Sequence, residues 1–570
     1  MKINLCYLHF DSYKIKLVTI EMQVTILSTG YLKRNHSMDT QSTSPLPSGN
    51  VYLTQRQYRQ QGNNSEELAL DLALAVASSK PLLPHKTVVK LPTLKKSTLM
   101  SAAVLALSTF IAGCATGPNY QKPSDTDLSA LHNAKMLNAR QTAAPMPALD
   151  SWWTGFHDPV LTGIIEHVLK QNLDLAAAIA RVDQARAIAT GTAAQRLPQG
   201  NLISDATRAK QSLQSPLGKI ASTFPGYERT QTFYDVGAGA SWELDLFGSL
   251  KRGSEAANAE EEAAEADHLG VRISVAAEAA DAYFRIRGAQ ARIALAENQV
   301  KTNNRLLELV GIRLNDGLST VREQAQAEAR LSEARASIPP LRTELERQSN
   351  RLDVLMGAQP GTYATELVKA PNTAVIPATA VADSPTAFLR RRPDVIAAER
   401  RLAASNANIG VAMAEYYPKL SLSGLLGFGS LGAAGLLSQN SFQPAVGLGL
   451  RWRIFDFGRI DAEIARAKGV NSEALLMYRL SMLRATEDVE NTIMTLAQLE
   501  VQSRELVREV DAHQRARDAS EEAYKGGAVS LTEVLDEDRL LLTGQDQLAQ
   551  AHADNARAAV TTFRALGGGW

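Results

Sequence analysis

Cys114 is the residue whose surroundings in the sequence most clearly predict a covalent modification. Lys95 and Lys96 precede about 14 mostly apolar residues, and the small residues Ala112 and Gly113 then lead into the cysteine. The apolar run is shorter than the ~20 residues that a helix needs to cross a bilayer. Because basic, apolar and small residues follow one another in the order of a secretory signal, we assign residues 91–113 to a signal peptide.

The end of this segment, Ile-Ala-Gly-Cys, resembles a bacterial lipobox. In a lipobox the cysteine is lipidated and becomes the first residue of the mature chain, which predicts a covalent lipid on Cys114 and a protein of the Gram-negative cell envelope. A buried helix with an incidental cysteine is the alternative. Residues 1–90 show no sustained periodicity. We interpret them as sequence upstream of the true start, with a genuine N-terminal extension as the alternative.

The composition excludes several classes of protein. Basic and acidic residues balance at 60 each, so no broad basic field indicates a nucleic-acid partner. The chain has two cysteines, of which only Cys114 lies in the mature part, so no disulfide framework is possible there. No run of about 18 apolar residues occurs, which leaves the strands of a closed barrel as the means of crossing a membrane.

Residue constellations typical of enzymes are absent from the sequence. It holds no paired histidines at metal-ligand spacing, no Gly-x-Ser-x-Gly and no phosphate loop. Gly427–Gly432 fits a dinucleotide-binding pattern, but a flexible stretch follows it where that fold needs an amphipathic helix. We therefore interpret it as the end of a strand that runs into a loop, and predict no enzyme, no metal site and no cofactor besides the lipid.

The elements that must position any functional residue are encoded twice. Trp242–Gly248 recurs as Trp452–Gly458, 210 positions later, and Arg313–Gly317 recurs as Ala523–Gly527 at the same offset. This period is far longer than a solenoid repeat, so we interpret it as a duplicated half-protein. The predicted parts are a lipid-anchored N-terminal segment (114–157), a first repeat (158–359), a linker (360–384) and a second repeat (385–570).

Each repeat is predicted to begin with a helix, at about 158–195 and about 393–416, followed by two extended segments. A very long helix comes next. No proline occurs between Gly248 and Asp316, and an unbroken helix over this span would reach roughly 100 Å. After a glycine-containing break a second helix returns. Pro339–Pro340 is expected to interrupt that returning helix in the first repeat alone.

Two of the extended segments, Val236–Leu246 and Val446–Ile454, alternate between apolar residues on one face and small or charged residues on the other. Their length suits strands that cross a membrane at a tilt, with the apolar side toward lipid. A soluble sheet with one wet face is the alternative. Four strands cannot close a barrel, and an open edge is not tolerated in lipid, so several chains would have to share one barrel.

The motifs that complete the pattern are Cys114–Tyr120, Trp152–Trp153, Asp158–Pro159, Arg391–Asp394, Phe455–Arg459 and Ala565–Trp570. Together and in this order they resemble the TolC-type outer-membrane efflux factors, in particular the NodT-like lipoprotein branch, over residues 114–570. The resemblance implies a mainly α fold with a membrane β-barrel portion. Three copies would form a coiled-coil α-barrel in the periplasm and a shared twelve-strand β-barrel in the outer membrane.

The resemblance also implies a function and the residues that serve it. The homotrimer would be the passive exit duct of a tripartite pump for small toxic compounds or drugs, together with a periplasmic adaptor and an inner-membrane resistance–nodulation–division transporter. Gly317 and Gly527 would mark the turns where the adaptor docks. Residues near those turns would form the periplasmic constriction, and by motif position they are Glu323, Tyr524, Glu533 and Asp536.

Two other functions stay open on the sequence. One is the exit duct of a type I protein secretion system, against which the lipobox and the terminal Gly-Gly-Gly-Trp weigh. The other is a structural periplasmic coiled-coil lipoprotein, which would have no need of strands with one apolar face. The transported compound cannot be read from the chain, because the pump partner largely selects it.

Overall fold

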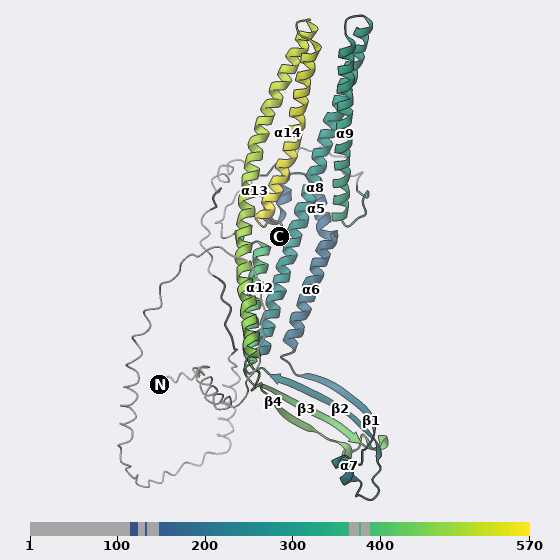
Figure 1. The fold of residues 1–570 in the computed structure, drawn as a ribbon, viewed down its shortest axis with the longest axis vertical. Helices are drawn as coiled ribbons and strands as arrows, with labels where there is room; N and C mark the ends of the chain where they lie inside the picture. The colour runs from purple at the N-terminus through teal and green to yellow at the C-terminus, as the bar shows by residue number, and fades with distance from the viewer. Residues whose placement is uncertain (1–114, 124–130, 134–146, 364–375, 378–387) are drawn as a thin grey trace, which may run out of the picture. The chain divides into compact units, whose positions relative to one another are not determined.

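The computed structural model describes residues 115–123, 131–133, 147–363, 376–377 and 388–570. Cys114, the assigned signal peptide and residues 1–90 lie outside these described residues. The described chain forms long helices and one antiparallel sheet, as Figure 1 shows. The prediction of a mainly helical chain with a few strands is thereby confirmed.

Two helical hairpins make up most of the described chain. The first consists of α8 (Ser249–Asn315) and α9 (Val321–Leu355), and the second of α13 (Arg459–Lys525) and α14 (Leu531–Ala565). The two long helices have 67 residues each and the two returning helices 35 each. Helix α14 packs along α8, so the hairpins lie side by side. The long unbroken helix predicted from the lack of proline is present.

The expected interruption at Pro339–Pro340 is wrong, because α9 continues through both prolines. Each proline lacks the N–H that would bond to the carbonyl four residues earlier, which frees the carbonyls of Arg335 and Ala336. All four residues lie on the exposed side of the helix, where water can satisfy those carbonyls. The missing bonds are therefore tolerated within a helix that its partners hold in place.

The single helix expected at about 158–195 is in fact two helices, α5 (Pro159–Gln171) and α6 (Leu173–Ala194). Asn172 separates them with an extended backbone, and its side-chain oxygen accepts the N–H of Leu175 at 2.9 Å to cap α6. Its side-chain nitrogen donates to the carbonyl of Leu355 at 2.9 Å, which ties the break to the end of α9. The corresponding helix of the second repeat is α12 (Pro393–Ala414), 220 positions after α6.

The sheet has four antiparallel strands in chain order, β1 (Gln199–Lys210), β2 (Thr230–Leu244), β3 (Lys419–Ser430) and β4 (Ala445–Arg451). Each repeat supplies one strand pair, and β2 joins β3 across the repeats. Strand β4 is shorter than the predicted 446–454. The last residue of β4, Arg451, pairs with Lys419, the first residue of β3. Pro418, which precedes Lys419, has no N–H with which to extend the ladder.

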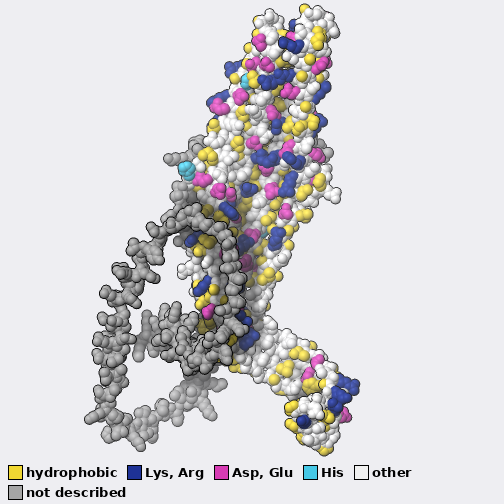
Figure 2. Space-filling view, viewed as in Figure 1, with side chains coloured by type: hydrophobic (Ala, Val, Ile, Leu, Met, Phe, Trp, Pro, Cys, Tyr) yellow, Lys and Arg dark blue, Asp and Glu magenta, His cyan; other side chains and the backbone are white. Residues whose placement is uncertain are grey.

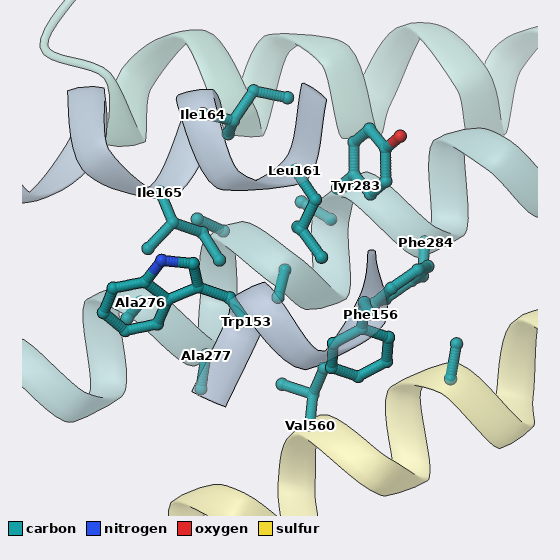
Figure 3. Packing of buried hydrophobic residues seen from close by; sticks show 14 of the residues in the cluster. Trp153, Phe156, Leu161, Ile164, Ile165, Ala276, Ala277, Tyr283, Phe284 and Val560 are labelled. Carbon is teal, nitrogen blue, oxygen red and sulfur yellow. The ribbon is translucent and has the colours of Figure 1, made fainter. Parts of the chain in front are cut away.

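The main hydrophobic core joins the first repeat to the end of the chain. It is built mainly from η1 (Leu149–Phe156), α5, α8 and α14, and residues of α9 and α13 complete it. Trp152 is fully buried and stacks on Phe563 of α14, with ring centroids 5.6 Å apart. Figure 3 shows Phe156 between Phe284 of α8 and Val560 of α14. This core fixes the second hairpin against the first far from their turns.

Candidate functional site

One face of the sheet is apolar and open. Residues paired across antiparallel strands share a face. The register places Trp242, Leu422 and Leu448 in one row. The other rows of this face are Leu202–Ala238–Leu426, Gly200–Ala240–Gly424–Val446 and Leu244–Leu420–Leu450. No described residue covers this face fully, and Val446 is 85%, Leu448 68% and Leu426 64% exposed. An apolar surface of this kind marks a contact with lipid or with another protein.

The opposite face of the same sheet is polar. Its rows include Lys419 beside Arg451, Asp205 beside Asp235, and Glu243 beside Ser421. Within the described chain, β1 and β4 each pair on one side only, so the sheet has two open edges. Figure 2 shows charged side chains of both signs spread over the visible face of the helices and few on the sheet apart from its loop end. The sheet is therefore built for apolar surroundings on one side and water on the other.

A tryptophan marks the helix-proximal end of the sheet in each repeat. The indole N–H of Trp242 donates to the carbonyl of Arg196 at 2.9 Å, and that of Trp452 donates to the carbonyl of Tyr416 at 2.9 Å. Both carbonyls belong to the residues that follow α6 and α12. The amphipathic indole suits a boundary between an apolar and a wet environment. The repeated contact holds the sheet to the helices in the same way twice.

The predicted turn residues Gly317 and Gly527 end the long helices with the same backbone geometry. Their φ values are 75° and 72°, in the left-handed region that glycine adopts without strain. Leu318 N–H donates to the Arg313 carbonyl at 2.7 Å, and Ala528 N–H donates to the Ala523 carbonyl at 2.8 Å. These are Schellman turns. A side chain at either glycine would meet open space, so each turn is exposed.

The predicted gate residues Glu323 and Glu533 both begin the returning helices as part of capping boxes. The Glu323 carboxylate accepts the Thr320 N–H at 2.8 Å and the Ser319 hydroxyl at 2.7 Å. These bonds, the serine first, hold the pKa of Glu323 below its usual value. The Glu533 carboxylate accepts the Ser530 N–H at a longer 3.4 Å. The sequence patterns that indicate these two capping boxes are Thr-x-x-Glu and Ser-x-x-Glu.

Tyr524 has a partner that the sequence analysis missed. The Arg313 guanidinium donates to the Tyr524 hydroxyl at 2.7 Å, and its carbon lies 5.2 Å from the ring centroid. Arg313 lies in the last turn of α8 and Tyr524 in the last turn of α13, so the contact links the two hairpins at their turns. Nearby, Tyr524 packs against a small cluster that contains Val310, Leu531 and Leu535. No local pattern pairs residues this far apart in the chain.

Asp536 also has an unpredicted partner. Its carboxylate is 55% exposed and lies 3.5 Å from the Arg330 guanidinium of α9. Each of the four predicted gate residues thus contacts a different partner. Farther from the turns, the Arg292 guanidinium of α8 binds the Asp546 carboxylate of α14 with two bonds of 2.6 and 2.9 Å. Charged pairs therefore link the hairpins at several levels.

The described residues contain no helix that is both long and apolar enough to cross a membrane. They also contain no group of histidine, cysteine, aspartate or glutamate residues placed to hold a metal ion. The predicted lipidation site Cys114 lies outside the described part of the chain, so its modification stays a prediction.

A family model described as outer membrane efflux protein matches residues 164–358 and 385–568. Nodulation protein T of Rhizobium leguminosarum bv. trifolii is 31% identical over 471 residues, covering 81% of this chain and 96% of the relative. The pyoverdine export outer membrane protein OpmQ of Pseudomonas putida is 32% identical over 436 residues, covering 75% and 90%.

Solved structures agree with these sequence relatives. The structure of the outer-membrane channel OprN superposes with a TM-score of 0.72 at 33% identity, covering 80% of this chain and all of that one. A structure of CusC gives a TM-score of 0.69 at 25% identity, again covering 80% of this chain and all of the other.

Proposed function

Because the chain belongs to the outer membrane efflux protein family, we propose that three copies of it form one conduit from the periplasm to the cell exterior. The protein is an outer-membrane efflux channel of a Gram-negative bacterium, and its fold is that of channels. The observation that carries the proposal is the sheet with one open apolar face and two edges that no described strand pairs with.

The sheet supports a shared barrel. Backbone groups on an open edge have no water to bind in lipid, and each unsatisfied group is costly there. Pairing β4 of one copy with β1 of the next would satisfy both edges at once. Three copies of four strands would then close a barrel with the apolar rows toward lipid and the Lys419–Arg451 row toward the lumen.

The helical hairpins would form the periplasmic part of the conduit. We propose that their turns at Gly317 and Gly527 face a periplasmic adaptor, and that an inner-membrane resistance–nodulation–division transporter supplies the energy. The channel itself would act as a passive duct for small compounds. Relatives whose names specify pyoverdine export and cation efflux fit cargo of this size.

The periplasmic gate is proposed at the same end. Glu533 and Asp536 are three residues apart and share one face of α14. Three-fold symmetry would turn each into a ring of carboxylates, which favours cations. The contact of Arg313 with Tyr524 and the cap formed by Glu323 would hold the neighbouring helix ends in place.

The test is to purify the full chain from outer membranes and determine its copy number by native mass spectrometry and its conductance in planar bilayers. We expect three copies and a steady single-channel conductance. A stable monomer without conductance would contradict the proposal. Loss of the gene should sensitise the cell to small toxic compounds, whereas an unchanged tolerance with loss of a secreted protein would indicate a protein secretion duct.

A further inference from the structure

The first described residues of the mature chain occupy a binding site of their own. We call Ala115–Tyr120 the strap. Thr116 donates both its N–H and its hydroxyl to the Phe247 carbonyl at 3.0 Å, and the hydroxyl also lies 3.3 Å from the Gly410 carbonyl. The Asn406 amide donates to the Pro118 carbonyl at 3.1 Å. The Tyr120 hydroxyl donates to the Glu399 carboxylate. The strap is thus bound along its length by α12 and the β2–α8 junction.

Arg252 lies at the centre of this site. It is on the first turns of α8, and its side chain is only 5% exposed. Its guanidinium donates to the carbonyls of Thr116 at 3.0 Å and Gly117 at 3.3 Å, and to the Asn119 side chain at 2.7 Å. Glu255 accepts a further bond at 2.7 Å. Because the planar guanidinium of this buried arginine binds backbone carbonyls, it recognises the backbone conformation of the bound segment more than the side chains of that segment.

The strap and α12 meet backbone to backbone. Gly117 has a φ of 87°, and a Cβ there would lie 2.5 Å from the Gly410 Cα. A Cβ on Gly410 would lie 2.8 Å from both the Thr116 carbonyl oxygen and the Arg252 side chain. Two glycines are therefore required for the contact, one on each side.

The duplication of the chain is broken at the residues that hold the strap. In α6, which corresponds to α12 at an offset of 220, Gly410, Asn406 and Glu399 are replaced by Thr190, Arg186 and Ile179. At the offset of 210, Arg252 is replaced by Ala462. The common fold therefore does not need these residues. Their presence in one repeat matches the one strap that the described residues contain.

We propose that the strap site fixes the position of the lipid on Cys114 relative to the sheet, with Arg252 as the positioning residue. The role given to the lipid rests on the lipidation of Cys114 that the sequence predicts. Ala115 packs against Gly248, where β2 passes into α8, since a Cβ on that glycine would lie 2.7 Å from the Ala115 Cα. A lipid at position 114 is one peptide unit, about 3.8 Å between Cα atoms, from this point. It would enter the membrane where the strands end.

The experiment places a nitroxide label on Lys122→Cys, an exposed position two residues after the strap, in the purified full chain. The label should be immobilised in the parent and mobile in Arg252→Met, which loses the three bonds that Arg252 donates to the strap. Gly410→Thr, which copies the residue of the first repeat, should displace the strap from the other side. Arg186→Met, which removes exposed ion pairs with Glu261 and Glu265, is the matched control and should leave the label immobile.

Exchange of the Thr116 amide with heavy water gives a second readout. It should rise about tenfold or more in Arg252→Met, because one charged hydrogen bond is worth at least about that factor in a local opening equilibrium. If Arg252→Met does not fold, the same label mobility is measured in Gly410→Thr and Thr116→Val instead. A label that stays immobile in every folded strap variant would overturn the strap site. If a second nitroxide attaches to Cys114, this cysteine carries no lipid and the role of the lipid is overturned. The mobility of the label at position 122 tests the strap site independently of that result.

Discussion

The two repeats agree where the backbone turns and differ where side chains meet partners outside their own repeat. Both long helices end in the same Schellman turn, both returning helices begin with a capping box, and both tryptophans bind a carbonyl at 2.9 Å. By contrast, Arg252, Arg313 and Arg330 correspond to Ala462, Ala523 and Leu540. The features that both repeats share build a helical hairpin and a strand pair in each repeat. The arginines that only the first repeat has make contacts that occur once per chain, with the strap or with the second hairpin.

The largest predicted difference between equivalent positions concerns the glycines that end the returning helices. Gly357 and Gly567 both have a φ of 75°, so alanine should be strained by about 1–2 kcal/mol at either. A Cβ on Gly357 would also lie 2.6 Å from the Gln171 carbonyl oxygen, which adds about 1–3 kcal/mol, whereas the nearest atom to Gly567 is 3.5 Å away. Thermal unfolding should show Gly357→Ala clearly less stable than Gly567→Ala. Equal losses would contradict the difference in packing.

The pair formed by Arg292 and Asp546 tests whether the hairpins act together. Its equivalents one repeat away are Gln502 and Ala336, so this link occurs once per chain. Both partners are partly exposed, so Asp546→Asn should lower stability by no more than about 1 kcal/mol. We expect longer channel openings in bilayers, because the hairpins would separate more readily. Asp511→Asn, which breaks an exposed pair within α13, is the control. Openings lengthened equally in both variants would show that the link is not specific.

The two repeats also carry different numbers of carboxylates just beyond their turns. The second repeat has Glu533 and Asp536 where the first has Glu323 and the neutral Gln326. A double variant Glu533→Gln, Asp536→Asn should therefore lose most of the cation preference of the channel, and Glu323→Gln should lose less. Reversal potentials in asymmetric salt measure this. If the double variant keeps the cation preference of the parent, these residues do not line the constriction.

The smallest predicted effect is on the two caps. The Glu323 carboxylate accepts the N-cap N–H at 2.8 Å and that of Glu533 does so at 3.4 Å, so Glu323→Gln should destabilise by a few tenths of a kcal/mol and Glu533→Gln by less. Since the pKa of Glu323 is lowered on folding, its contribution is present above the ordinary glutamate pKa and lost as the pH falls through the lowered value. Melting temperatures of parent and Glu323→Gln should therefore converge in acid. A gap that persists there would assign the effect to something other than the charge.

Much of the backbone was predictable because it follows local rules. The absence of proline, the glycines at the turns and the strand alternation gave the hairpins and the sheet. The break at Asn172 was missed because its side chain caps α6 and reaches Leu355, a partner 183 positions away. The prolines of α9 were misjudged because exposure decides whether freed carbonyls can bind water. The partners of Tyr524 and Asp536 come from other helices, and no local pattern encodes such pairings.

In the proposed trimer, one face of the sheet lies against lipid and the other lines a shared lumen. Leu426 and Leu425 are adjacent near the middle of β3 and point to opposite faces, the first to the apolar rows and the second to the polar side. Arginine on the lipid face near the middle of a membrane costs about 2–4 kcal/mol per chain, and arginine in the lumen does not. The measurement is the yield of heat-resistant trimers in the outer membrane for Leu426→Arg and Leu425→Arg. We expect Leu426→Arg to abolish trimers and Leu425→Arg to form them with altered conductance; equal yields from the two variants would contradict the assignment of the two faces.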